Sequence, residues 1–363
     1  MTTPVSPPTP ARVHNAARAR ARFGGLLDRV LPFYDRCDPL ADAVVRELDA
    51  LRVAGVGDIE RIVDETLRGR DHVRAPASLR RLALESRAEP VWLDRARLER
   101  AGGLLFRAGP LGGFVLMLRS LVAGYMAPAG NKPLALSGRL LDAAPRRLSE
   151  TSRFVAAVCK PRGLRPGAEG HVITLKVRLM HARVRALVRR SGRYREREWG
   201  APINQHDMMA TILLFSQVFI DGLRILGLRV DPREADDYVH LWRYVGWLIG
   251  VEPELLPACE RESQRLLEFV RVTQGTPDDD SRALTDALLQ VPMTQARDDA
   301  QRRLAARLIR FNKSLCRVLI GDELADAVAL PRYPARHAMP ALQLLLASAD
   351  SVRARVPGLP RLA

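Results

Sequence analysis

The segment from Val172 to Val188 has the spacing of an amphipathic helix, and a single histidine interrupts its apolar side. Val177, His181, Val184 and Val188 are four, three and four residues apart, so they share one face of an α-helix. Basic residues fill many of the positions between them. A histidine in an apolar wall must satisfy two ring nitrogens. An axial metal bond with a hydrogen bond from the other nitrogen is one solution, and two ordinary hydrogen bonds are the alternative that this helix alone favours.

The rest of the chain also favours helices. Hydrophobic residues make up 47% of the 363 positions but aromatic residues only 5%, while alanine, leucine and arginine are abundant. No series of alternating strands with hairpin turns occurs, and no repeat of fixed period. The sequence therefore predicts an all-α protein large enough to bury a substantial core.

Several motifs follow the histidine helix in a specific order. They are Trp199-Gly-Ala-Pro-Ile-Asn-Gln-His-Asp207, Phe215-Ser216, Gly222-Leu-Arg-Ile-Leu-Gly227 and Tyr238-Val-His-Leu-Trp-Arg-Tyr-Val-Gly246. Together with the upstream Val-Arg-Leu-Met-His-Ala-Arg-Val-Arg run, this order resembles the latex clearing proteins (rubber oxygenases) and the related MpaB-type oxygenases over about 130–251. Those relatives are all-helical and hold haem b non-covalently. The resemblance implies a multi-helix bundle with a globin-like haem-binding core and additional N- and C-terminal helices, with His181 as the proximal iron ligand.

Two residues on one helix face are candidates for the open side of the haem. Arg147 and Thr151 are four residues apart. In the rubber oxygenases an arginine and a threonine at this spacing line the distal pocket, which implies that Arg147 orients dioxygen and Thr151 orders water or substrate. The alternative is an exposed arginine and a helix threonine bonded to a carbonyl. Glu150 departs from the family, where a lysine can precede that threonine; this glutamate is expected to pair with Arg147.

Further residues are assigned to the cofactor. The resemblance places Thr211 near the haem, although a helix threonine within a core is an equal alternative. Arg178 and Arg243 are candidates to pair with the haem propionates. His206 and His240 are rival iron ligands, and we expect structural roles for both.

The chain is expected to divide into four parts. Residues 1–22 read as a flexible basic tail, 23–130 as an N-terminal helical cap, 131–251 as the haem-binding core and 252–363 as C-terminal helices packed on that core. The cap ends at a loop predicted over Pro128–Pro133, where proline and glycine interrupt the helical pattern. The longest C-terminal helix is predicted over Gln295–Ile320 and the last over Ala338–Val356.

Charge and cysteine usage limit the partners. The net charge is +16, but the arginines are spread over nearly every helix, so we expect no specific nucleic-acid partner and leave contact with a membrane surface open. The four cysteines lie far apart, without a Cys-x-x-Cys-His motif, so any haem is b-type. The first residues lack an apolar signal region, and a cytoplasmic location is expected.

These observations predict a haem b-dependent oxygenase that uses O2 to oxygenate or cleave a carbon–carbon double bond in a hydrophobic isoprenoid or lipid-like substrate. The relatives cleave such bonds to carbonyl products. Two alternatives stay open. One is a haem- or lipid-binding sensor or carrier without turnover. The other is a haem-free helical protein whose basic face binds nucleic acid or an anionic membrane.

Overall fold

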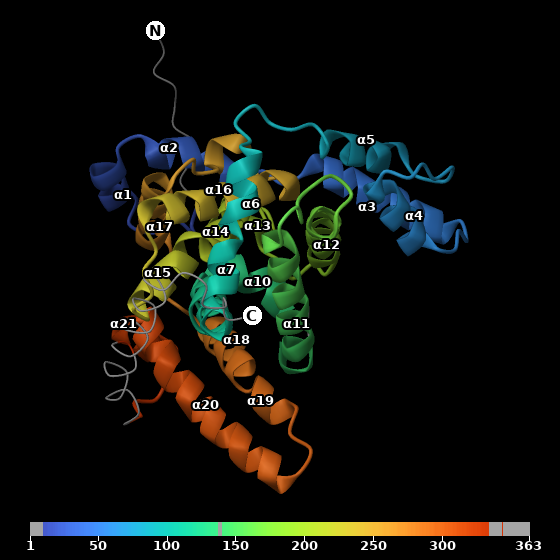
Figure 1. The fold of residues 1–363 in the computed structure, drawn as a ribbon. Coiled ribbons are helices and arrows are strands. Elements are labelled where there is room, and N and C mark those ends of the chain that lie inside the picture. The colour runs from blue at the N-terminus through green and yellow to red at the C-terminus, as the bar shows by residue number, and fades with distance from the viewer. Residues whose placement is uncertain (1–9, 137–139, 334–342, 344–363) are drawn as a thin grey trace.

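The structure is a computed structural model that describes residues 10–136, 140–333 and Gln343. Every regular element in these ranges is a helix (Figure 1). The all-α prediction is therefore confirmed for this part of the chain. The last predicted helix, Ala338–Val356, lies almost wholly outside the described residues.

The amino-terminal part of the chain consists of short helices joined by tight turns. They are α1 (Ala16–Phe23), α2 (Leu26–Val30), the 3-10 helix η1 (Leu31–Tyr34), α3 (Pro39–Val53), α4 (Ile59–Arg68), α5 (Ala77–Glu85), α6 (Arg95–Ala101), α7 (Gly103–Ala108), α8 (Pro110–Val115), the π-helical turn η2 (Leu116–Leu121) and α9 (Val122–Tyr125).

Longer helices follow. The central elements are α10 (Pro128–Leu136), α11 (Leu140–Cys159), α12 (Glu169–Arg190), α13 (Glu196–Trp199), α14 (Gln205–Phe215), α15 (Gln217–Ile225) and α16 (Pro232–Ile249). The carboxy-terminal elements are the 3-10 helix η3 (Pro253–Leu255), α17 (Glu260–Thr273), α18 (Asp279–Leu289), α19 (Val291–Thr294), α20 (Asp299–Ile320) and α21 (Asp322–Ala327).

Polar side chains fix where several of these helices begin. The side chain of Asp38 accepts a hydrogen bond from the backbone N–H of Ala41 at the start of α3, and that of Asn204 accepts one from Asp207 at the start of α14. Each satisfies an amide that has no partner within its own helix. The two side chains thus stabilise the first turns of α3 and α14.

Helix α16 lies at the centre of the core and packs against α6, α12, α14 and α17. Its Tyr238, Trp242 and Tyr244 are fully buried, and Trp242 stacks on Phe215 of α14 with 4.8 Å between ring centres. One continuous cluster of buried apolar side chains extends from Val13 to Leu330. Residues of the predicted cap, core and C-terminal helices thus share one core, and their boundaries stay predictions.

The prediction of a flexible tail over residues 1–22 is wrong for its second half. The Arg12 guanidinium is buried, where it pairs with the Asp207 carboxylate at 2.5 Å and donates to the Trp199 carbonyl at 2.6 Å. Val13 is buried, and α1 begins at Ala16. The composition of this segment is that of a tail, but a partner 195 residues away holds it in place.

The loop predicted over residues 128–133 is also wrong, because these residues open helix α10. Pro128 begins the helix, where no backbone N–H is needed. The Asn131 side chain donates to the Tyr125 carbonyl and to the Ser281 hydroxyl, and Lys132 pairs with Asp278. Contacts with the start of α18 thus override the low helix propensity of the segment.

The stretch from Gln205 to Ile225 is divided into two helices, α14 and α15, at Ser216, where φ and ψ are −99° and −86°. The combined stretch Gln205–Ile225 is long and apolar enough to cross a bilayer, but 61% of its most apolar window is buried inside the fold. Burial in the core explains why this stretch is so apolar, because Phe215, Val218 and Phe219 all belong to the buried cluster.

Substitutions at the junction of α6 and α7 can test how tightly this core is packed. A methyl group on Gly102 would overlap the backbone carbonyl of Cys159 in α11, whereas one on the neighbouring Gly103 would meet nothing within 4 Å. We expect Gly102→Ala to lower the free energy of unfolding by about 2 kcal/mol or more. Gly103→Ala should be neutral or stabilising by up to about 1 kcal/mol. Urea unfolding of both variants measures this, and equal stabilities would contradict the packing.

Candidate functional site

Helix α12 places His181 at the edge of its buried face. Leu175, Leu179 and Ala182 are fully buried, whereas His181 is half-buried. Beside it lies a row of apolar side chains that are half-buried or exposed: Val177, Met180 (44% exposed), Val184 and Leu187 (49% exposed). The predicted face with Val177 and Val184 is therefore an open apolar strip and not the centre of the core, and such a strip suits a flat apolar ligand.

The His181 ring has a buried nitrogen without a partner. Its Nδ1 is shielded from solvent and makes no hydrogen bond with the part of the chain that the structure describes. Burial, assisted by the positive charge of Arg185 and opposed by Asp38, lowers the pKa of His181 to about 4. The imidazole is therefore neutral near pH 7 and keeps a nitrogen lone pair. Within the described residues Nδ1 thus lacks the hydrogen bond that a structural core histidine makes, so the ring fits a metal ligand.

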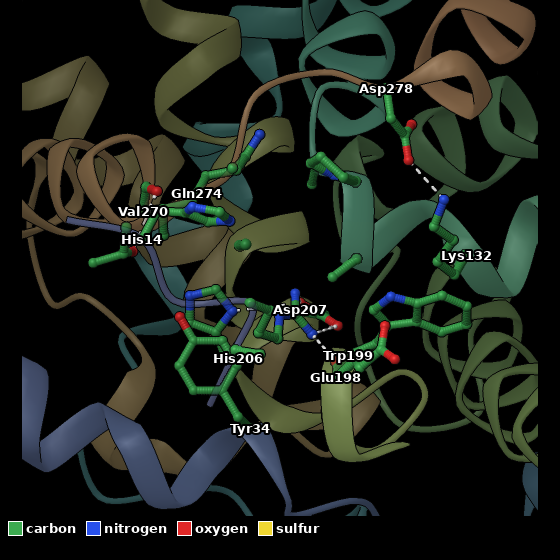
Figure 2. A pocket seen from close by; sticks show the side chains of 18 of the residues that line it. His14, Tyr34, Lys132, Glu198, Trp199, His206, Asp207, Val270, Gln274 and Asp278 are labelled. Carbon is green, nitrogen blue, oxygen red and sulfur yellow. Dashed lines mark hydrogen bonds and ion pairs between the residues drawn. The ribbon is translucent and has the colours of Figure 1, made fainter. Parts of the chain in front are cut away.

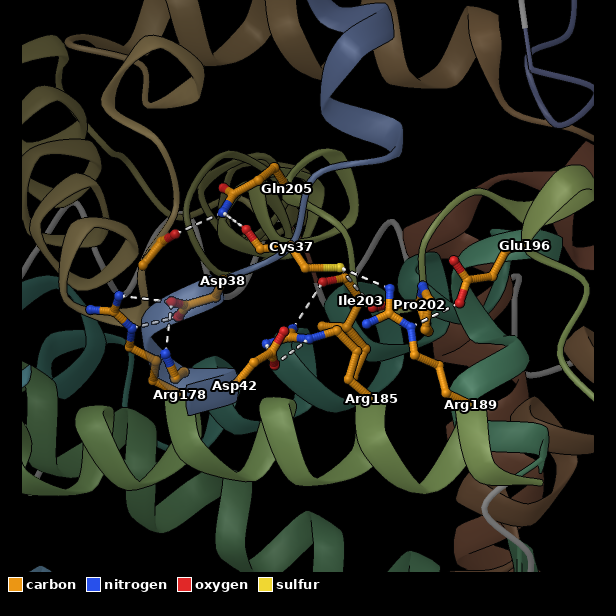
Figure 3. Close-up of polar contacts among 12 residues, drawn as sticks. Cys37, Asp38, Asp42, Arg178, Arg185, Arg189, Glu196, Pro202, Ile203 and Gln205 are labelled. Atoms are coloured by element: carbon orange, nitrogen blue, oxygen red, sulfur yellow. Dashed lines mark hydrogen bonds and ion pairs between the residues drawn. The ribbon is translucent and has the colours of Figure 1, made fainter. Parts of the chain in front are cut away.

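Two ion pairs flank His181 along the same face of α12 (Figure 3). Arg178 pairs with Asp38 through two nitrogens at 2.6 and 3.0 Å, and Arg185 pairs with Asp42 at 2.6 Å. Asp38 caps α3 and Asp42 lies in its first turn. The side chains of both arginines are largely shielded from solvent. These pairs fix α12 against α3, with His181 between them in sequence.

The two arginines expected to bind propionates are engaged elsewhere. Arg178 is held by Asp38, as described above. Arg243 of α16 lies with its guanidinium carbon 4.1 Å from the centre of the Trp92 ring, in a cation–π contact. The Arg243 Nε is buried without a hydrogen-bond partner among the described residues, so a propionate role stays a prediction for Arg243, whereas Arg178 is held by Asp38.

Arg147 and Thr151 share the half-buried side of α11. The Arg147 charge is near enough to Tyr125 of α9 to oppose the rise that burial causes in the Tyr125 pKa. Arg147 itself makes no ion pair with any residue described in the structure, although most arginines near it do. The Arg147 guanidinium has five N–H donors, so it can donate hydrogen bonds to a ligand.

Thr151 lines an apolar pocket of about 350 Å³ between α11 and the α7–η2 segment. The other side chains of its wall include four leucines, Phe106, Met117 and Val155, with Ser152 next to Thr151 in the sequence. Part of the wall is the π-helical turn η2, a feature that frequently marks functional sites. Arg147 and Thr151 thus face different surroundings, one beside Tyr125 and the other at an apolar cavity.

Glu150 does not pair with Arg147, and that expectation is wrong. Its carboxylate accepts a hydrogen bond from Arg146 Nε at 2.8 Å, across one exposed turn of α11. A spacing of four residues brings the two side chains together more readily than a spacing of three in this helix. Arg147 therefore has no ion-pair partner among the residues that the structure describes.

Thr211 is exposed on a helix whose other side is buried. Its hydroxyl donates to the Asp207 carbonyl at 2.8 Å, as a helix threonine commonly does. It shares its side of α14 with Ala210 and Leu214, which are half-buried, and Leu214 reaches Gly124 of α9. This side of α14 and Arg147 of α11 therefore both approach α9.

The rival histidines have structural contacts, as expected. His206 stacks on Tyr34 with 4.2 Å between ring centres, and its Nδ1 lies 3.4 Å from the Asp207 carboxylate. His240 accepts a hydrogen bond at Nε2 from the Asp94 backbone N–H at 3.0 Å. Each ring therefore has a polar partner at one nitrogen, although His206 Nε2, like His181 Nδ1, is buried without a partner among the described residues.

A second pocket, of about 440 Å³, lies at the amino-terminal end of α14 (Figure 2). Its wall includes the buried pair of Arg12 and Asp207, together with His206, Lys132 and Trp199. Arg12 keeps the pKa of Asp207 at about 2, against the effect of burial. Sequence analysis missed this pair, because nothing near Arg12 in the sequence distinguishes it from a solvated tail residue.

Among the described residues, no three histidine, cysteine or acidic side chains gather as a metal site. An iron ion bound at His181 would thus take most of its ligands from a macrocycle and not from the protein. His181, whose Nδ1 has no hydrogen-bond partner among the described residues, fits that arrangement.

Comparisons with known proteins agree with this architecture. A family model described as "ER-bound oxygenase mpaB/B'/Rubber oxygenase, catalytic domain" matches residues 106–350. A rubber oxygenase from Streptomyces sp. (strain K30) is 25% identical over 265 residues, which cover 71% of this chain and 62% of that protein. The chain thus corresponds to less than two thirds of the length of that relative.

A solved structure is also similar. The structure of latex clearing protein in the closed state superposes with a TM-score of 0.64 at 24% sequence identity, and the match covers 91% of this chain and 86% of that one. The likeness shows that the two proteins share a fold, extending beyond the matched catalytic domain to most of the chain.

The pair of Arg178 and Asp38 can be tested by a double-mutant cycle. Arg178→Met leaves the Asp38 carboxylate buried without its counter-charge and should cost about 3 kcal/mol of unfolding free energy. Asp38→Asn keeps an oxygen to cap α3, and the double variant should recover at least about 1 kcal/mol of the summed losses. Arg52→Met, which breaks an exposed pair with Asp49, should cost about 0.5 kcal/mol or less. Additive effects of the two buried substitutions would show that the pair is not coupled.

Proposed function

Because the chain belongs to the MpaB and rubber-oxygenase catalytic-domain family, we propose that it is a haem b-dependent oxygenase that acts with O2 on a carbon–carbon double bond of a hydrophobic isoprenoid or lipid-like molecule. The partnerless Nδ1 of a neutral, half-buried His181 carries the proposal. A buried polar atom of this kind costs stability unless a ligand completes the site. The apolar strip beside it offers the contact that a porphyrin face needs.

Haem b, when bound, supplies the redox chemistry that allows dioxygen to react with a carbon–carbon double bond. The residues of this chain would hold and surround the group. His181 would provide the ring nitrogen that binds the iron, and burial keeps its imidazole neutral. The half-buried side chains of Val177 and Val184 would cover apolar atoms of the bound group. The ion pairs of Arg178 and Arg185 hold the helix that carries the ligand.

The substrate side is assigned to α11. The unpaired guanidinium of Arg147 can donate hydrogen bonds to an oxygen atom and stabilise negative charge that develops on it. The Thr151 hydroxyl stands at the apolar pocket of about 350 Å³, where it can order water or the substrate. A pocket of this size and lining suits a hydrocarbon chain of limited length, held by apolar contact.

Replacing His181 tests the axial assignment. His181→Ala removes the only nitrogen assigned to the iron, so haem affinity should fall by more than about 100-fold and the Soret band of the loaded protein should collapse or shift. His240→Gln is the matched control, because its imidazole is similarly shifted to a pKa of about 4 but already accepts a hydrogen bond. Absorption spectra during haem titration, with circular dichroism to verify the fold, give the answer. An unchanged Soret band in His181→Ala would remove the assignment.

Replacing Arg147 separates turnover from binding. Arg147→Ala should retain haem but slow oxygen consumption with a polyunsaturated isoprenoid by about 100-fold, since a positioned donor is lost. Arg146→Ala, one residue earlier, removes only the exposed pair with Glu150 and should leave the rate unchanged. Equal rates in both variants would remove the role of Arg147. Haem uptake without oxygen consumption in the unmodified protein would favour the sensor or carrier.

A further inference from the structure

Helices α19 and α20 form an arm that extends from the body of the protein (Figure 1). The carboxy-terminal half of α20 is anchored, since Leu315, Cys316 and Leu319 are buried and the helix packs against η2. In the amino-terminal half, only Ala305 and Ile309 are buried. The first turns of α20 therefore present most of their circumference to solvent.

Two rows of side chains run side by side along this exposed half. One row is apolar, with Leu304 64% exposed and Leu308 41% exposed, and it continues to the half-buried Phe311. The other row is basic and fully on the surface, with Arg303, Arg307 and Arg310 at the same helical spacing. Spacings of four and three residues keep each row straight along the helix.

The three arginines differ from their neighbours in having no counter-charge. Arg302 pairs with Asp299 at 2.6 Å, and Lys313 pairs with Asp286 at 3.1 Å. Arg303, Arg307 and Arg310 make no ion pair with any residue in the ranges that the structure describes. Between positions 295 and 313 the sequence has six basic and two acidic residues. The arm is thus a positively charged surface with exposed leucines along its edge.

We propose that this arm docks on the surface of a membrane that carries anionic lipids. A helix with an apolar row beside a basic row lies in the plane of such a surface, with the leucines in the boundary between headgroups and acyl chains. The arginines meet the phosphates and extend their apolar stems along the same boundary. An anionic bilayer supplies both the negative charge and the apolar phase that the two rows require.

This inference goes beyond the proposed oxygenase and does not depend on it, because the arm is remote in sequence from His181 and needs no cofactor. If both hold, docking would bring the site to the phase in which a hydrophobic substrate dissolves. Binding measured without haem keeps the two proposals separate.

The experiment is co-sedimentation of the full chain with vesicles. We expect binding to vesicles of mixed phosphatidylcholine and phosphatidylserine, little binding to phosphatidylcholine alone, and weakening at high salt. Arg303→Gln/Arg307→Gln/Arg310→Gln should weaken binding by about 100-fold, since each arginine near an anionic surface contributes about fivefold. Leu304→Ser/Leu308→Ser should weaken it by at least about tenfold through lost apolar burial.

The matched control is Leu84→Ser, which alters an exposed leucine (71%) on α5, away from the arm, and should bind as the unmodified chain does. All these side chains are at the surface, so the variants should keep the fold, which circular dichroism verifies. Failure of the unmodified chain to bind the anionic vesicles would overturn the proposal, as would binding that neither arm variant weakens. A dimer in solution that Leu304→Ser/Leu308→Ser dissociates, with no vesicle binding, would also overturn it and assign the face to a second copy of the chain.

Discussion

The site depends on how α12 is held against α3 by two buried ion pairs. Arg178 and Arg185 lie on the same face of α12, one turn before and one turn after His181, and they pair with Asp38 and Asp42. Asp38 also caps α3, so one carboxylate both starts a helix and positions another. A buried charge without its partner is costly, which makes this arrangement strongly preferred over a shifted one. Between these pairs in sequence, Nδ1 of His181 is buried without a hydrogen-bond partner in the described part of the chain.

Much of the fold follows from local signals in the sequence. The side chains of Asp38 and Asn204 cap α3 and α14, and the apolar period over 172–188 marks most of α12, which extends from Glu169 to Arg190. What sequence could not supply are the distant partners. The sequence around Arg178 does not show that its guanidinium pairs with Asp38, which lies 140 residues earlier in the chain. Arg12 and the opening of α10 were misjudged for the same reason, because contacts with α14 and α18 decide their structure.

The candidate site was predicted unevenly, for physical reasons. His181 was found because its helix period and flanking motifs are local. Its place at the edge of the buried face, beside Met180 and Leu187, depends on which neighbours cover α12, and no helical period shows that. Glu150 was expected to pair with Arg147, but in the structure it pairs with Arg146, and Arg147 has no ion pair within the described ranges. The roles proposed for Arg147, Thr151 and Thr211 rest on the family and on this placement together.

The most direct test of the account is an experimental structure of the protein loaded with haem. The account predicts an iron ion bonded to a ring nitrogen of His181, with the porphyrin against the apolar strip of Val177, Met180 and Val184. Haem bound in the second pocket, beside Arg12, or held through His206, would contradict it. Either of those results would leave the partnerless nitrogen of His181 without the ligand that the account assigns to it.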